Sequence, residues 1–264
     1  MLLFKRIFDF SRTALARLRD KRHAKRYPVA PGFPLKATVS LLGTDDSAAS
    51  AARVDRGLAW SGAVADLSGS GLRLRLPPAA ATARGERTVL TLAFEGFALR
   101  IPCIVAHYRE QPTEALCGLS LRFDDERHRK AYLQLLEAVA IGAGFVADKP
   151  ARAKAGPVTQ RYRSEGRAVL TVSRAGAGAP VGAIELVIGD HCVRSAGEGF
   201  GLEVLTAREP RSAVPQSVQR QEILRLFRIV AANLPKTMPA DLRERMRALA
   251  HPSMPAPGRA ALAH

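Results

Sequence analysis

Apolar side chains alternate with more polar ones where the first ordered pattern of the chain begins, at Leu35, Ala37, Val39 and Leu41. A repeat of two residues is the period of a β-strand with one buried face, whereas a helix repeats every 3.6 residues. Five more strand-like runs follow, and Gly- or Pro-containing breaks separate most of them. They cover residues 59–67, 72–76, 88–94, 97–108 and 116–123. Short strands at this spacing, with no helical pattern between them, predict an antiparallel sheet closed into a small barrel.

Residues 124–140 change to a helical period. Their apolar side chains form one stripe, made of Ala131, Leu135, Leu136 and Val139. The acidic run Asp124-Asp125-Glu126 precedes this stripe, where it suits the positive end of a helix dipole, and a helix start accounts for it better than a metal site. We therefore expect one barrel domain, residues 21–141, that ends in a helix.

The rest of the chain is expected to hold a second, smaller folded region. Its predicted parts are a linker at 142–160, an α+β region of unknown function at 161–250 and a disordered tail at 251–264. Strand-like runs at 168–173, 182–188 and 201–205 precede a helix at 216–234, which Pro235 ends. The apolar face of residues 223–234 can serve either the core or a partner protein.

Residues 1–20 have the pattern of a basic amphipathic helix. Its apolar face consists of Leu3, Ile7, Phe10, Ala14 and Leu18. Such a helix can cover the following domain or a partner, or it can lie on an anionic membrane surface. Lys5, Arg6 and Asp9 interrupt the apolar run, so neither a transmembrane helix nor a secretory signal is expected.

The formal net charge of +16 is unevenly distributed along the chain. Residues 1–30 carry 9 Lys and Arg against 2 Asp and Glu, while residues 31–144 carry 13 against 12. The predicted barrel is thus close to neutral, which argues against nucleic acid held over its surface. The alternative function is a basic adaptor that binds nucleic acid or a membrane surface and uses the barrel as a scaffold.

No catalytic or metal site is expected from the sequence. The six histidines are scattered, and no nucleophile elbow, metal pair or phosphate loop is present. The glycine-rich stretch at 197–201 lacks a following helix and a Lys, so it is predicted to be a turn. Cys103, Cys117 and Cys192 occur singly, which is typical of packed, reduced thiols in a cytoplasmic protein.

Two polar clusters fit a small, planar ligand with two negative charges. They are Arg22-His23-Ala24-Lys25-Arg26 and Asp66-Leu67-Ser68-Gly69-Ser70-Gly71. The planar fork of arginine donates paired hydrogen bonds to phosphate oxygens or to the O6 and N7 edge of guanine. An aspartate can accept from guanine N1–H and N2–H, while serine and glycine allow close polar contacts. Each cluster alone is weak evidence, because the arginine spacing recurs at 163–167 and 243–247 and the hexapeptide also fits an ordinary turn.

The order of these clusters within the chain adds to the evidence. The arginine cluster leads into Tyr27-Pro28-Val29 and the first strand, the Asp66 cluster joins two apolar strands, and Gly118-Leu119-Ser120-Leu121-Arg122-Phe123 leads into the helix. With this arrangement, about residues 20–140 resemble the PilZ family of cyclic di-GMP receptors. The resemblance implies a six-stranded antiparallel barrel with a C-terminal helix, which binds one cyclic di-GMP or a stacked pair on its outer face.

The same resemblance implies roles for individual residues. Arg22 and Arg26 would clamp guanine edges and phosphates, and Asp66, Ser68 and Gly71 would receive a guanine. Lys21 matches a position that is frequently basic in the family and would assist with phosphate.

The protein implied by the resemblance is a bacterial, cytoplasmic receptor that needs no cofactor besides its ligand. Neutralising and ordering residues 19–26 would re-aim the N-terminal helix and pass the signal to an effector protein. Motility, exopolysaccharide and pilus machinery are all candidate partners, and the sequence does not choose among them. Residues 1–20 would permit peripheral contact with the inner membrane.

Overall fold

The computed structural model describes residues 25–41, 58–148, 157–164, 168–196, 201–208, 211–215 and 217–251. The predicted helix at 1–20 lies outside the described residues, as does the predicted tail beyond His251. The described residues divide into two compact units, with the boundary between Glu137 and Ala138.

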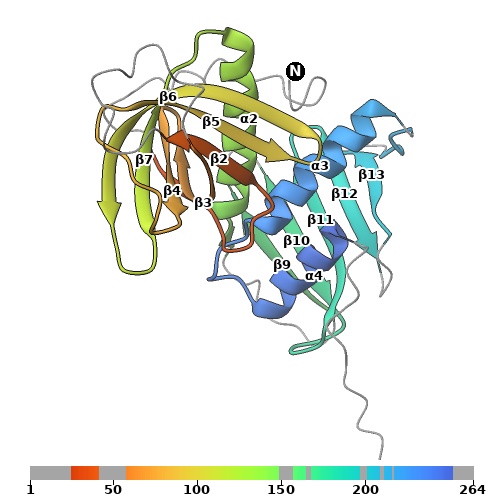
Figure 1. Cartoon of the computed structure of the whole chain (residues 1–264). Coiled ribbons are helices and arrows are strands. Elements are labelled where there is room, and N and C mark those ends of the chain that lie inside the picture. The colour runs from red at the N-terminus through yellow and green to blue at the C-terminus, as the bar shows by residue number, and fades with distance from the viewer. Residues whose placement is uncertain are drawn as a thin grey trace, which may run out of the picture. The chain divides into compact units, whose positions relative to one another are not determined.

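The first unit is a closed antiparallel barrel (Figure 1). Its strands are β1 (Tyr27–Pro28), β2 (Lys36–Leu41), β3 (Leu58–Ser68), β4 (Gly71–Leu76), β5 (Arg87–Phe94), β6 (Phe97–Glu110) and β7 (Ala115–Leu121). Neighbouring strands follow the order β1-β3-β2-β5-β6-β7-β4, and β4 also pairs with β3. Six strands therefore close on themselves, while the short β1 adds to one edge of β3. The predicted six-stranded antiparallel barrel is confirmed.

Every second side chain of the barrel strands fills the interior, as the sequence alternation predicts. Representative buried residues are Ala37, Val39, Leu41, Leu90, Leu92, Leu99, Ile101, Val105 and Leu119. Cys103 and Cys117 belong to the same core, and burial is the main reason that the pKa of each thiol rises to about 12. Both therefore remain protonated thiols, which confirms that they are packed core residues.

Helix α2 (Glu126–Ala143) follows the barrel directly. Asp125 Oδ1 accepts a hydrogen bond from the backbone N–H of Arg127 at 2.8 Å, so the acidic run marks the helix start as predicted. The predicted apolar stripe is buried, including Ala131, Leu135 and Leu136. The helix extends three residues beyond its predicted end at residue 140.

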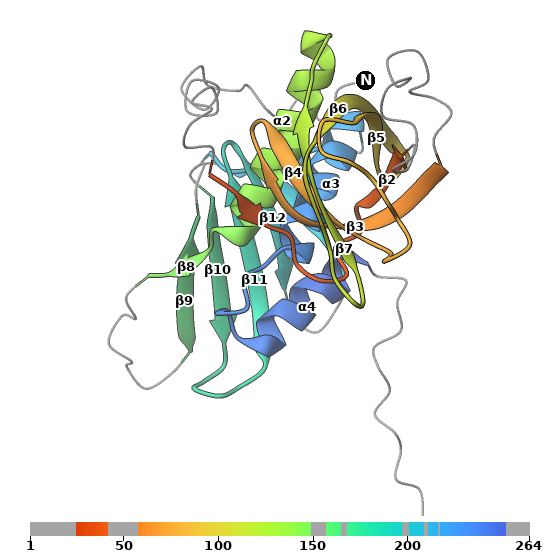
Figure 2. The same cartoon turned by 60° about the vertical axis from the view of Figure 1, so that its left-hand side comes forward.

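The second unit is a six-stranded antiparallel sheet with two helices (Figures 1 and 2). Its elements are β8 (Val146–Ala147), β9 (Val158–Arg163), β10 (Val169–Arg174), β11 (Val181–Ile188), β12 (His191–Ala196), β13 (Glu203–Thr206), α3 (Val218–Ala232) and α4 (Ala240–Ala250). The strand order is the reverse of the chain order, from β13 to β8. Helix α3 contacts α4, β12 and β13. Its apolar residues Ile223, Leu226 and Phe227 are buried, so this face serves the core and not a partner.

Three features of this unit differ from the sequence expectation. The predicted linker at 142–160 contains the end of α2, the strand β8 and the start of β9. Strand β12 and helix α4 were not predicted, because charged residues interrupt the apolar ones in both. Strand β8 pairs with β9, and an Arg163–Asp148 ion pair of 2.8 Å supports this pairing. A local sequence pattern does not reveal that residues 146–147 have a strand partner. Among the described helices, none has the length and apolar content needed to cross a membrane.

The buried carboxyl group of Glu137 predicts a pH effect on stability. One carboxylate oxygen has no hydrogen-bond partner among the described residues, and burial raises the pKa of this group from 4.5 to about 7. Between these two pKa values, Glu137 keeps its proton in the folded chain and has released it in the unfolded chain. The free energy of unfolding therefore decreases as the pH rises from about 4.5 to about 7.

The variant Glu137→Gln should remove this loss. Relative to the parent protein, its stability is expected to increase between about pH 5 and about pH 8, when urea unfolding is followed by fluorescence of the single tryptophan, Trp60 in β3. A difference between the two proteins that stays constant over this range would contradict the assignment.

Candidate ligand-binding site on the barrel

A β-bulge in β3 places the Asp66 carboxylate on the outer side of the barrel. Val64 pairs with Leu74, and the next paired residue, Asp66, pairs with Arg73, so Ala65 is an extra residue in the strand. If Ala65 were paired like its neighbours, simple alternation would direct Asp66 to the same side as Val64; because Ala65 is unpaired, Val64 and Leu67 are both buried and Asp66 lies on the other face. The bulge thus leaves the Asp66 side chain on the outer face of the barrel, between two residues whose side chains lie in the core.

Two arginines hold the Asp66 carboxylate. Arg26 Nη1 donates to one oxygen at 2.6 Å, and Arg73 Nη2 lies 2.5 Å from the other. Pairing of Pro28 with Asp66 brings the arm before β1 alongside β3, which explains how Arg26 reaches a residue forty positions away. Arg73 comes from β4, directly opposite Asp66.

The burial of these three side chains differs in a way that matters for binding. The Asp66 side chain is 6% exposed, whereas those of Arg26 and Arg73 are 49% and 45% exposed. A carboxylate removed from water needs charge compensation, and the two guanidinium groups supply it. Because the arginines are about half in solvent, they can exchange this partner for another anion at modest cost.

Ser68 and Gly71 form the two ends of the hairpin turn between β3 and β4. The Ser68 hydroxyl donates to the Gly71 carbonyl oxygen at 3.0 Å. A Cβ at Gly71 would lie 2.6 Å from the Leu119 carbonyl oxygen of β7, so the barrel itself requires glycine at this position. Its backbone does not have a left-handed φ, and close approach of two strands is the reason for the glycine.

Tyr132 in α2 is hydrogen-bonded to this turn from the buried side. Its hydroxyl lies 2.7 Å from the Ser68 carbonyl oxygen, to which it donates, and 3.2 Å from that of Gly71. The ring is fully buried and lies 5.4 Å from the Phe123 ring, measured between centroids. Burial is the main cause that raises the pKa of Tyr132, so the hydroxyl stays protonated as a donor.

The fold brings together four of the six predicted site residues. Arg26, Asp66, Ser68 and Gly71 lie at one end of the β3–β4 hairpin. Arg22 and Lys21 lie outside the described residues, so their predicted roles remain predictions. Ligand binding by the other four also remains a prediction.

Sequence reasoning missed Arg73 and Tyr132 as parts of this region. A signal for Arg73 was present, because a two-residue turn at 69–70 pairs Ser68 with Gly71 and hence Asp66 with Arg73. Tyr132 lies on the buried face of α2, where a tyrosine hydroxyl needs a partner, but the pattern does not say which one.

Asp66 and Arg73 belong to a row of paired residues that continues across β7 and β6. Arg73 pairs with Gly118 on β7, and Gly118 pairs with His107 on β6. A side chain on Gly118 would collide with the His107 imidazole, which therefore lies directly on the glycine backbone. A second bulge, between Val105 and His107, accompanies this placement.

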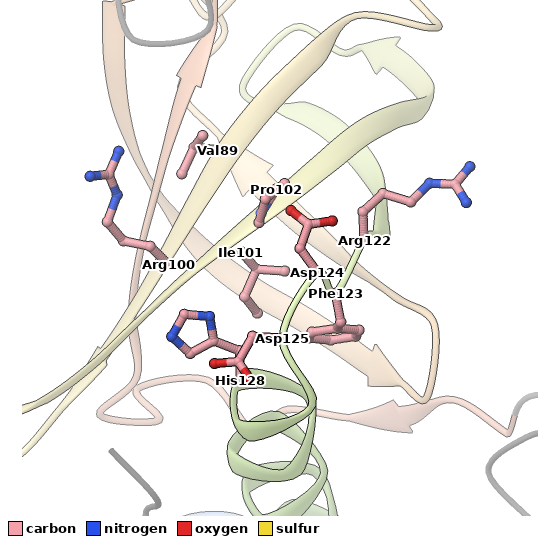
Figure 3. Close-up of a pocket in the computed structure, with 9 residues that line it drawn as sticks. All are labelled: Val89, Arg100, Ile101, Pro102, Arg122, Phe123, Asp124, Asp125 and His128. Atoms are coloured by element: carbon pink, nitrogen blue, oxygen red, sulfur yellow. The ribbon is translucent and has the colours of Figure 1, made fainter.

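Two hollows on the barrel lie apart from the predicted residues. One, of about 450 Å³, is lined by Val89, Arg100, Ile101, Pro102, Arg122, Phe123, Asp124, Asp125 and His128 (Figure 3). The Arg100 and Arg122 side chains point to opposite sides of it, so they do not converge on one anion (Figure 3). The other, of about 660 Å³, is bounded by residues 29–33, 35–38 and 61–64 together with Arg75. Over the described ranges, no group of His, Cys, Asp or Glu is arranged to hold a metal ion.

Comparison with known proteins identifies the first unit. Residues 20–138 match the family model of the PilZ domain, a range that includes both predicted clusters and most of α2. No curated protein and no solved structure gives a significant match to the chain. The resemblance inferred from the sequence is confirmed.

The shared pairing of Asp66 predicts a non-additive effect on stability. Arg26→Ala or Arg73→Ala alone should lower the free energy of barrel unfolding by about 1 kcal/mol or less, since one guanidinium remains. The double variant should lose about 3 kcal/mol, because it leaves a buried carboxylate without a cation.

Urea unfolding followed by Trp60 fluorescence measures this cycle, because Trp60 lies in β3 and pairs with Val39 of β2. In an Asp66→Asn background the coupling between the two arginines should disappear. Strictly additive losses in the Asp66 protein would show that the two guanidinium groups do not share one carboxylate.

Proposed function

We propose, with residues 20–138 belonging to the PilZ domain family, that this chain is a cyclic di-GMP receptor. Its proposed ligand site consists of Arg22, Arg26, Asp66, Ser68 and Gly71, with Lys21 assisting at a phosphate. The single observation that carries the proposal is the contact between Arg26 and Asp66, because it joins the two halves of the motif.

The chemistry of these groups matches that of the ligand. Asp66 can accept hydrogen bonds from guanine N1–H and N2–H, which is a pattern that guanine presents and adenine does not. Arg26 can bind a phosphate oxygen or the O6 and N7 edge of a guanine with its planar fork. Because the ligand is a dianion, each arginine also contributes long-range attraction, which dissolved salt weakens.

Signal output is proposed to pass through the arm that precedes β1 and on to an effector protein. PilZ domains are ligand-binding receptors, and the chain is proposed to act by rearrangement rather than by catalysis. A ligand with two phosphates would neutralise the cationic residues 19–26 and order them against the barrel. The N-terminal segment would then present a different surface to the motility, exopolysaccharide or pilus machinery, or to the inner membrane.

A second candidate function rests on the charge distribution. Residues 1–30 carry 9 basic residues against 2 acidic ones, so an adaptor that binds nucleic acid or an anionic membrane would use this segment and leave the barrel as a scaffold. Salt-dependent binding to nucleic acid, with no preference for a guanine dinucleotide, would favour this function.

Calorimetric titration with cyclic di-GMP tests the receptor proposal. The intact chain should bind, and Arg26→Ala and Asp66→Asn should each weaken binding at least about tenfold, which corresponds to about 1.4 kcal/mol. Arg163→Ala is the matched control, because Arg163 begins an Arg-x-x-x-Arg spacing that has no Asp-x-Ser-x-x-Gly after it. This control should bind like the parent protein.

Absence of binding heat with the intact chain, or equal binding by the parent and Arg26→Ala, would falsify the proposal. Amide-exchange protection of residues 1–26 with and without cyclic di-GMP tests the arm separately. If the protein binds cyclic di-GMP but the amide-exchange protection of residues 1–26 does not change, the proposed rearrangement is wrong and the receptor function still stands.

A further inference from the structure

We infer that Arg73 is a third ligand-binding arginine of this site, which rests on the proposed function. It lies outside both motif clusters and is contributed by the barrel wall instead of the N-terminal arm. Its proposed partner is a phosphate of the cyclic dinucleotide.

The backbone of Arg73 is held firmly in place. Strand β4 is hydrogen-bonded to β3 on one side and to β7 on the other, and Arg73 pairs with Asp66 and with Gly118. Its side chain is 45% exposed while its guanidinium lies 2.5 Å from Asp66. The Arg73 guanidinium contacts Asp66, which is the proposed guanine acceptor, and it is also exposed to solvent. It is therefore within reach of a ligand bound at Asp66.

Binding of guanine at Asp66 changes the partners of this guanidinium. In the structure, Arg26 and Arg73 each take one oxygen of the carboxylate. Guanine N1–H and N2–H must compete for the same oxygens, and a displaced guanidinium needs a new anion close by. The phosphates of the same ligand supply that anion without moving the barrel.

The neighbour of Arg73 on the side away from Asp66 is Gly118 of β7, and the His107 imidazole lies over the Gly118 backbone. Arg73 thus has a carboxylate on one side and an exposed imidazole ring on the other. Among its paired neighbours on β3 and β7, Asp66 is therefore the group that carries a negative charge, and the ligand phosphate would be the second.

Arg75 provides a matched control for this inference. It lies two residues along the same strand, points to the same face and is also exposed, but it pairs with Ala63 instead of Asp66. Both Arg→Ala changes remove one positive charge from β4, so a difference between them reports on position and not on net charge.

The test is calorimetric titration of the parent, Arg73→Ala, Arg73→Lys and Arg75→Ala proteins with cyclic di-GMP at low and at high salt. Arg73→Ala should weaken binding at least about tenfold and reduce its salt dependence, whereas Arg75→Ala should change it by less than about twofold. Arg73→Lys should fall between the parent and Arg73→Ala, because it keeps the charge and loses the planar fork. Since lysine can still compensate Asp66, an unchanged urea transition of this variant shows that the loss concerns the ligand and not folding.

Each other outcome overturns the inference. If the parent does not bind, the proposed function fails before Arg73 is tested. If the parent binds and Arg73→Ala binds as well as Arg75→Ala, Arg73 is not a ligand contact. Tighter binding by Arg73→Ala would show that Arg73 only competes with the ligand for Asp66. A larger loss of affinity in Arg75→Ala than in Arg73→Ala would indicate that the ligand binds in the 660 Å³ hollow, which Arg75 lines.

Discussion

Strand β3 supports three other strands at once, and the rest of the barrel depends on this pairing. Its first half pairs with β2, its second half pairs with β4, and its end also pairs with β1. The β3–β4 pairs close the barrel, while the β1 pairs bring Arg26 to Asp66. The backbone hydrogen bonds that complete the fold therefore also assemble the charged cluster.

Part of this architecture was predictable from local rules. The alternation of apolar residues marks the strands, and the short Gly69-Ser70 turn sets the register that places Asp66 opposite Arg73. The bulge at Ala65 was not predictable, because an extra residue in a strand of small side chains leaves no mark in hydrophobicity. Strand β8 and helix α4 were missed for a different reason: β8 has only two residues, and charged residues interrupt the apolar ones of α4. Pairing of β8 with β9, and packing of α4 against α3, outweigh a weak local preference.

The Asp66–Gly71 cluster combines two kinds of residue that a motif does not separate. Ser68 and Gly71 shape the turn and its contacts with β7 and Tyr132, whereas Asp66 and its arginines carry the charge. Substituting Gly71 would push Leu119 away and disturb the strand that bears Arg73. Loss of binding after such a change would reflect backbone geometry, while loss at Asp66 would reflect recognition.

The single extra residue at Ala65 has a consequence for comparing barrels of this kind. Deleting Ala65 would make Val64, Asp66 and Leu67 consecutive, and simple alternation would still place Val64 and Leu67 inside and Asp66 outside. The extra residue therefore absorbs a one-residue difference in strand length without changing the face on which the acid lies. Two barrels of this kind can differ by one residue upstream of the hexapeptide and still present its aspartate on the same outer face.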